Sequence, residues 1–260
     1  MQSEKAFLQP YEYTLHLADS SLIMGHRLSE WTGHGPSLEQ DIAVTNIALD
    51  LIGQARNFYQ YAAVLAQENE NKSITEDELA YLRDARDFKN LLLTELPNGD
   101  WGKTIFKIFF FSTWQYFVFQ RLIHSSDAQL SAIAEKSLKE VTYHVRWSSE
   151  WIIRLGDGTD ESHQRMEKAL NELWPYTGEF FEAVDYENQA ADVRIGITVG
   201  EIENDWNHKI KAVLEEATLE MPEDGVWMQT GGKTGLHTEH LGYVLAELQF
   251  LQRAYPGCEW

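Results

Sequence analysis

The sequence predicts an all-α fold, a bundle of long helices joined by short connections. Common helix-forming residues recur along the whole chain, and only 6 prolines interrupt its 260 residues. Several stretches repeat apolar residues at alternating steps of three and four, the period of a helix with one buried face. Patterns typical of strands are almost absent. Since no linker is visible, we expect one domain over residues 1–260.

Local signals indicate the first three helices. The first is expected over residues 11–31. Pro36 suits the first turn of the second helix, which keeps one apolar face for about six turns. Thr75 and Glu78 have the spacing of a capping box and are expected to open a third helix over residues 75–95.

Two longer helices are expected in the middle of the chain. Residues 100–124 are apolar almost all round, which is typical of a central helix of a bundle. Lys107 and Arg121 within this stretch favour a buried core helix over a membrane span. Asp127 is placed to cap the next helix, which should end at the glycines that follow residue 155.

The last third of the chain is less regular. Thr198 and Glu201 repeat the capping-box spacing and are expected to open a helix. The expected elements are helices over residues 160–181, 198–219 and 238–255, a glycine-rich loop over 230–235 and a largely irregular segment over 184–197.

Composition limits the classes of partner. The net charge of -20 at pH 7 repels phosphate backbones and anionic lipid, so we expect neither nucleic acid nor a membrane as partner. The single cysteine, Cys258, excludes an intramolecular disulfide and a Cys-x-x-Cys zinc site. Residues 1–13 lack the basic and apolar regions of a signal peptide, so a cytoplasmic location is expected.

Helical bundles can hold two metal ions between four helices, with a glutamate from each of two helices and a Glu-x-x-His pair from each of the others. The sequence contains no Glu-x-x-His. In the nearest matches Asp160 and Asp205 precede a histidine by three residues, in polar surroundings typical of exposed faces or caps. Glu140 and His144 share a helix face, but the companion helices offer no matching pair. We therefore assign no catalytic residue to this chain.

Several separate segments together resemble one known family, the C-subunit (PaaC) family of the bacterial phenylacetyl-CoA epoxidase complex. The resemblance covers nearly the whole chain and is weakest over residues 185–199. The segments that carry it are Gly25-His26-Arg27-Leu28-Ser29-Glu30-Trp31, residues 46–57, residues 90–99, residues 139–160 and Thr230-Gly231-Gly232-Lys233-Thr234-Gly235-Leu236-His237-Thr238-Glu239-His240.

The resemblance implies a ferritin-like helical bundle with additional C-terminal helices. It also implies a non-catalytic structural subunit, which pairs with a related catalytic A subunit that carries the di-iron centre. With a small B subunit and a reductase, that complex uses oxygen and NADPH to epoxidise the ring of phenylacetyl-CoA in aerobic phenylacetate catabolism. The di-iron centre, NADPH, FAD and 2Fe-2S cluster are then expected elsewhere in the complex, and no cofactor is expected in this chain.

The same resemblance locates four vestigial ligand positions. Related active bundles often read Asp-Glu-x-Gly-His-Ala-Arg in the second helix, where this chain has Leu51 for the glutamate and Gln54 for the histidine. In a later helix Val141 stands where a glutamate usually lies three residues before His144. The loss of this much charge suits a metal-free core, because unpaired buried carboxylates are costly.

Two alternatives stay open. In the first, the chain is a metal-dependent oxygenase subunit with a rearranged di-iron site built from His26, Glu30, Glu140 or His144. In the second, it is a module that contacts an acyl-CoA. A homodimer of the isolated chain is open as well. The candidate contacts to a partner subunit or to phenylacetyl-CoA are Lys233, His237, Glu239 and His240, beside glycines that would allow a close approach of the backbone.

Overall fold

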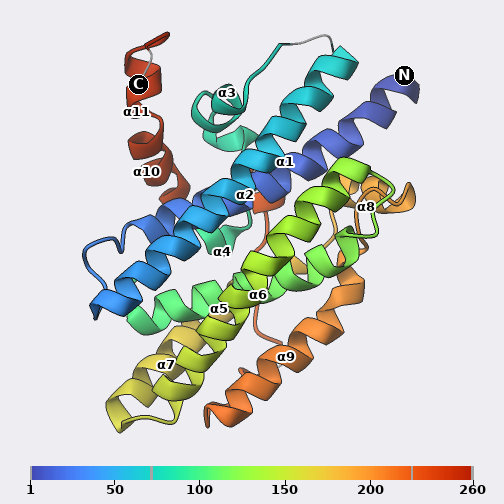
Figure 1. The fold of residues 1–260 in the computed structure, drawn as a ribbon. Helices are drawn as coiled ribbons and strands as arrows, with labels where there is room; N and C mark the ends of the chain where they lie inside the picture. The colour runs from blue at the N-terminus through green and yellow to red at the C-terminus, as the bar shows by residue number, and fades with distance from the viewer. Residues whose placement is uncertain (1, 71–72, 224, 259–260) are drawn as a thin grey trace. The chain divides into compact units, whose positions relative to one another are not determined.

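Two long helices, α1 (Gln2–Ser29) and α2 (Leu38–Glu70), pack along their lengths in the computed structural model of the chain (Figure 1). The structure describes residues 2–70, 73–223 and 225–258. Every regular element in these residues is a helix, so the predicted all-α, ferritin-like fold class is confirmed. Within the same residues, no helix combines the length and apolar character needed to cross a membrane.

The described residues fall into two compact units. The first unit comprises the described parts of Met1–Pro97, Val184–Gly196 and Gly231–Trp260. The second unit comprises those of Asn98–Ala183 and Ile197–Thr230. The prediction of a single domain over residues 1–260 stays a prediction.

Helix α1 is the centre of the first unit, because it contacts helices from all three segments of that unit. From Tyr13 to Leu28 nearly every side chain of α1 is buried. The other helices of the first unit are α3 (Glu76–Tyr81), α4 (Leu92–Glu95), α8 (Asp185–Asp192), α10 (Glu239–Leu248) and α11 (Phe250–Ala254).

The two long faces of α2 differ in their surroundings. The predicted apolar face is confirmed, because its side chains, at steps of three and four, are all buried. The outward face also carries large apolar side chains, which the sequence analysis did not predict. These exposed residues are Leu38, Ile42, Leu49 and Val64.

The third predicted helix is shorter than expected. Its capping box is confirmed: the Glu78 amide donates to Thr75 Oγ1 at 3.2 Å, and the Thr75 amide donates to Glu78 Oε2 at 2.8 Å. However, α3 ends at Tyr81 rather than near residue 95. Arg83 stops it, since its guanidinium binds the carbonyl of Leu79 within α3, at 2.6 Å, and a buried carboxylate on α1. A tertiary contact thus replaces the helical turns that local sequence favours.

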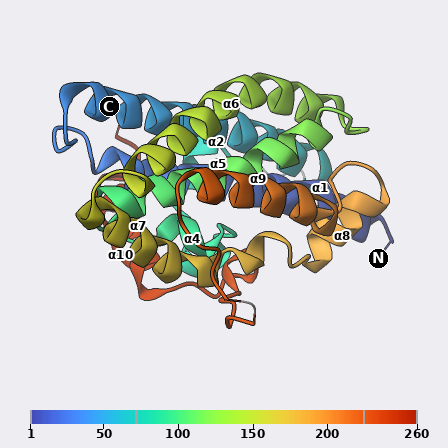
Figure 2. The ribbon, with the colours of Figure 1, turned by 90° about the horizontal axis from the view of Figure 1, so that it is seen from below.

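The second unit is built on α5 (Trp101–Leu122), which packs against α6 (Ala128–Gly156), α7 (Asp160–Leu173) and α9 (Glu203–Glu216) (Figure 2). As predicted, α5 is buried on almost every side. Asp127 is confirmed as the cap of α6, because its Oδ1 accepts from the amides of Gln129 and Leu130, both at 2.9 Å.

Two boundaries in the second unit differ from the prediction. The helix expected over residues 160–181 ends at Leu173, and 3₁₀ turns follow, because Pro175 has no N–H to continue the α-helical hydrogen bonds. The second predicted capping box is wrong. Thr198 makes no side-chain cap, and a 3₁₀ turn, Val199–Ile202, leads into α9.

In the first unit, the segment expected to be largely irregular contains α8, whose first turn is capped by the Glu187 carboxylate. The last predicted helix is divided into α10 and α11 at Gln249. The side chain of Gln249 donates to the carbonyls of Ala80 and Arg83, at 3.2 and 3.0 Å. This contact anchors the C-terminal helices to α3 and the residues that follow it.

Asp127→Ala should lower the free energy of unfolding by about 1 kcal/mol, because two amides at the start of α6 lose their acceptor. The measurement is a urea unfolding curve. Asp127→Asn is the matched control, since an amide oxygen can accept the same bonds. Equal losses in both variants would contradict the capping role.

Candidate functional site

Helix α1 carries a line of buried polar side chains. His16, Asp19, Ser20 and Arg27 share one face of the helix, and none is more than 8% exposed. All four bind backbone groups of residues 83–95, the segment that follows α3 and ends with α4. His16 Nδ1 binds the Lys89 carbonyl at 2.7 Å, the Lys89 amide donates to Asp19 Oδ2 at 2.8 Å, the Leu91 amide donates to Ser20 Oγ at 3.2 Å, and Arg27 Nε donates to the Glu95 carbonyl at 2.9 Å. Side chains of α1 therefore satisfy backbone groups that no helix or sheet would pair.

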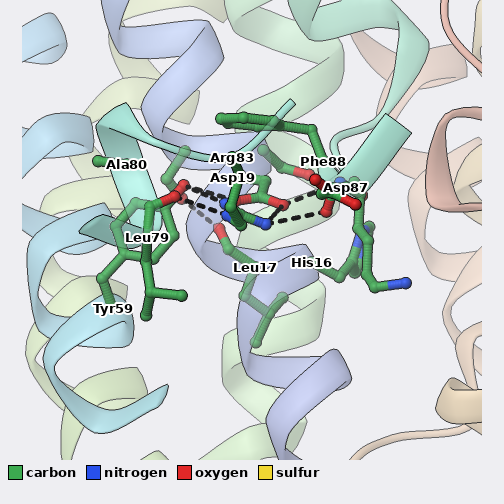
Figure 3. Close-up of polar contacts among 12 residues, drawn as sticks. His16, Leu17, Asp19, Tyr59, Leu79, Ala80, Arg83, Asp87 and Phe88 are labelled. Atoms are coloured by element: carbon green, nitrogen blue, oxygen red, sulfur yellow. Dashed lines mark hydrogen bonds and ion pairs between the residues drawn. The ribbon is translucent and has the colours of Figure 1, made fainter. Parts of the chain in front are cut away.

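Asp19 is the most heavily bonded of these residues (Figure 3). Its carboxylate accepts from the Tyr59 hydroxyl at 2.5 Å and from both terminal nitrogens of Arg83. The Arg83 guanidinium also lies over the Phe88 ring, 4.3 Å from its centroid. Burial, and next to it the negative charge of Asp19, raise the pKa of Tyr59 well above its usual value, so the phenol stays protonated and donates.

A second buried cluster joins α1, α8 and the glycine-rich segment. Lys233 Nζ lies 3.1 and 3.0 Å from the two carboxylate oxygens of Glu187, and both side chains are at most 2% exposed. His16 Nε2 lies 3.8 Å from Glu187 Oε1. Burial dominates the environment of this histidine and lowers its pKa to about 4, so the ring is neutral at pH 7.

A third cluster centres on Glu95 at the end of α4. Its buried carboxylate accepts from Asn90 Nδ2 and His237 Nδ1, both at 2.9 Å, and from the Thr238 amide at 2.6 Å. His237 Nε2 lies 2.9 Å from the Phe88 carbonyl. Three separate parts of the chain, α1, residues 83–95 and residues 231–240, thus meet in one polar core of the first unit.

The four candidate contact residues occupy different environments. Lys233 lies inside the first unit, paired with Glu187, and the side chain of His237 is only 5% exposed. Glu239 is exposed in the first turn of α10, and His240 is half-buried. Gly235 adopts a positive φ of 81°, and a Cβ there would collide with the Arg86 carbonyl, so this glycine serves a close approach within the chain itself. Their role as contacts to a partner or to phenylacetyl-CoA stays a prediction.

The four positions predicted to be vestigial metal ligands are divided between the two units. Leu51 and Gln54 are buried on α2 of the first unit, and Val141 and His144 are buried on α6 of the second. Leu51 and Val141 offer no donor atom, and the amide of Gln54 brings no negative charge. These side chains do not fit a carboxylate-bridged di-iron centre, which needs anionic oxygen ligands. Nor does the described part of the chain gather three or more His, Cys, Asp or Glu side chains in a metal-binding group.

Two apolar surfaces of the first unit are accessible. One is the outward face of α2 already described. The other, here called the C-terminal surface, consists of Leu236, Tyr243, Phe250, Leu251 and Tyr255, which are 45 to 69% exposed. A groove of about 530 Å³ runs beside it, lined by Gly242, Ala246 and Phe250 on one side and by Asp84 and Ala85 on the other. Exposed apolar patches of this kind often mark contacts with other proteins.

Of the residues that build the polar core, sequence patterns singled out Lys233 and His237, as candidate contacts, but not the acidic residues that pair with them. His16 and Asp19 interrupt the apolar run Leu15–Met24, and such polar residues on a buried helix face are a usable signal. The acidic and basic side chains that complete the core, Arg83, Glu95 and Glu187, had no comparable signal, because no local pattern shows which charged residue will be buried.

Comparison with known proteins identifies the family. The family model described as "Phenylacetic acid catabolic protein" matches residues 1–260. The chain belongs to the phenylacetic acid catabolic protein family. It is 48% identical over 248 residues to the C subunit of 1,2-phenylacetyl-CoA epoxidase of Escherichia coli (strain K12), a match that covers 95% of this chain and 98% of the relative. The resemblance to the C-subunit family is therefore confirmed.

The family match covers all the residues discussed above. The match extends over the vestigial positions and over the polar core alike.

Asp19→Asn should lower the free energy of unfolding by about 3–5 kcal/mol, because Arg83 would remain buried without its counter-charge. Chemical denaturation measures the loss. The matched control is Glu161→Gln in the exposed pair of Glu161 with Arg165, where about 0.3–0.5 kcal/mol is expected. Similar losses at both positions would show that the buried pair has no special role.

His16 should make the fold sensitive to acid. Since its pKa is lowered to about 4 in the folded chain, the unfolded state binds the proton more readily. The neutral His16 ring therefore contributes fully to the free energy of unfolding above about pH 6.5, the ordinary pKa of histidine. This contribution declines as the pH falls towards about 4. His16→Gln should flatten this part of the stability profile, measured by urea midpoints across the pH range. Replacement of exposed His34 by Gln is the control, and a similar flattening there would refute the assignment.

Proposed function

We propose that this chain is a non-catalytic structural subunit of a phenylacetyl-CoA epoxidase, in which it pairs with and supports a related di-iron catalytic subunit. The observation that carries the proposal is its 48% identity, over 95% of its length, to the relative named as the C subunit of 1,2-phenylacetyl-CoA epoxidase. Within such a complex the chain would serve aerobic phenylacetate catabolism in the cytoplasm.

The chemistry of the ligand positions supports a non-catalytic role. Leu51 and Val141 are fully aliphatic and at most 2% exposed, so neither iron nor a proton can be held there. Gln54 could supply a neutral oxygen or amide N–H at most. A bundle with these side chains gains stability from apolar burial at positions where a catalytic relative would bear the cost of buried carboxylates.

The catalytic apparatus then belongs to the partners. We assign the di-iron centre to the A subunit, and NADPH, FAD and the 2Fe-2S cluster to the reductase, and we expect the assembly to include a small B subunit. This chain would supply the rigid surface against which the catalytic subunit docks. The ion pairs and hydrogen bonds of its polar core support that role, because they hold several chain segments in one arrangement.

The exposed apolar surfaces are the natural docking faces. Leu38, Ile42 and Leu49 line the outward face of α2, and Leu236 and Tyr243 belong to the C-terminal surface. An obligate subunit interface buries large apolar areas, so a partner that covered either face would gain binding free energy. Lys233→Ala is a poor probe of such contact, because it would break the buried pair with Glu187 and disturb the fold itself.

The proposal predicts that the purified chain binds almost no iron or manganese after expression in metal-supplemented medium, as measured by mass spectrometry.

It further predicts that epoxidation of phenylacetyl-CoA by the catalytic subunit, the B subunit and the reductase is strongly reduced when this chain is omitted. The chain tested without the catalytic subunit should be inactive.

The catalytic subunit, prepared in the same way, is the positive control for metal loading. Stoichiometric metal in this chain would overturn the structural role and make Glu30, Glu140 and His144 the first residues to replace. If epoxidation proceeded at the full rate without this chain, the proposal that it supports the catalytic subunit would be wrong.

A further inference from the structure

Polar contacts fasten the C-terminal segment, Gly231–Cys258, to the rest of the first unit, and His237 makes two of them. We propose that His237 is a pH-dependent latch: its doubly protonated ring holds the start of the C-terminal segment against residues 88–95, and loss of one proton at alkaline pH loosens that attachment. Three features of the structure support the latch: His237 faces two hydrogen-bond acceptors, its side chain is buried, and one of the acceptors is the negatively charged Glu95.

Both ring nitrogens of His237 face acceptors. Nδ1 lies 2.9 Å from Glu95 Oε2, and Nε2 lies 2.9 Å from the Phe88 carbonyl. A carbonyl oxygen can only accept, so two good hydrogen bonds need N–H groups on both nitrogens, and only the imidazolium has them. In the neutral ring one nitrogen would turn a lone pair towards an oxygen lone pair. The side chain is 5% exposed, so water has little access to relieve that repulsion.

The charges around His237 also favour the cation. The other donors to the Glu95 carboxylate, Asn90 Nδ2 and the Thr238 amide, are neutral. From α1, Asp19 adds a further negative charge. Arg27 forms an ion pair with Glu30 at 2.7 Å and donates to the backbone carbonyls of Glu95 and His240. Within the C-terminal segment, Lys233 is paired with Glu187 of α8, and Glu239 and His240 follow in the first turn of α10. The charged group in direct contact with the His237 ring is thus the Glu95 carboxylate, which favours the protonated ring.

The sign of the pH effect follows from these groups. Burial alone lowers the pKa of His237, but the hydrogen bond and charge of Glu95, with smaller help from the Phe88 carbonyl and Asp19, raise it above the usual 6.5. A group with a raised pKa in the folded state stabilises that state fully below its unfolded value. The stabilisation is lost as pH rises through the folded-state pKa, so the latch is closed near pH 6.5 and below.

The latch also bears on assembly. Leu236 lies next to His237, and Tyr243 lies on α10, so both exposed side chains belong to the segment that the latch fastens. This consequence rests on the proposed function, since it takes the C-terminal surface as a docking face. A loosened segment would present that surface in many arrangements, and association with the catalytic subunit would weaken.

The test is amide hydrogen exchange of the isolated full-length chain at about pH 6 and about pH 9, corrected for the intrinsic pH dependence of exchange. Peptides from the C-terminal segment around His237 should lose about tenfold or more in protection at the higher pH, while peptides from α5 should not. His237→Gln should show low protection at both values. His34→Gln, which replaces an exposed histidine of the same unit, should behave as the wild type.

Two further measurements keep the proposal falsifiable if His237→Gln does not fold. Histidine resonances of the wild type should show one ring that titrates above about 6.5, and Glu95→Gln should move that titration to lower pH. Constant protection across pH in the wild type, or an unchanged titration in Glu95→Gln, would overturn the latch. Absence of binding to the catalytic subunit at every pH, with the latch intact, would instead overturn the proposed function.

Discussion

The buried carboxylate of Asp19 is the constraint on which the first unit depends. Taking a carboxylate out of water costs several kcal/mol unless donors and a counter-charge surround it. Asp19 meets that requirement with the Tyr59 hydroxyl of α2 and with the Arg83 guanidinium and the Lys89 amide, which both come from the segment between α3 and α4. The same contacts stop α3 and fix the course of residues 83–91 towards α4. Glu95 is thereby held where His237 and the Thr238 amide can reach it.

Buried negative charge in this chain lies away from the predicted vestigial ligand positions. Carboxylates that could bind metal are absent at Leu51 and Val141, yet Asp19, Glu95 and Glu187 are all buried. Each of the three has a cationic or histidine partner from a distant part of the chain. Buried negative charge in the first unit therefore holds chain segments together. A subunit whose proposed task is to support another needs such fixed internal geometry more than it needs a reactive centre.

Sequence patterns succeeded where a helix depends on its own periodicity and caps. The buried face of α2, the apolar α5 and the Asp127 cap of α6 were all predicted, because neighbouring residues encode them. Predictions failed where distant groups compete for the backbone. Arg83 ends α3 through Asp19, and Gln249 divides the last helix through contacts with Ala80 and Arg83. Thr198 has the spacing of a cap, but its backbone enters a 3₁₀ turn, in which the side chain makes no cap.

By itself, the sequence determined the all-α class, the net negative charge and the family. Composition, helical period and short motifs can all be read without knowing which distant residues meet. Only the tertiary structure decided what the charged residues do. Lys233 and Glu187 are 46 residues apart, and His237 and Glu95 are 142 apart, so no local pattern could pair them. Lys233 resembles an exposed contact residue in the sequence and is a buried ion-pair partner in the fold. Burial makes the difference, because a charge removed from water must find its partner wherever the chain brings one.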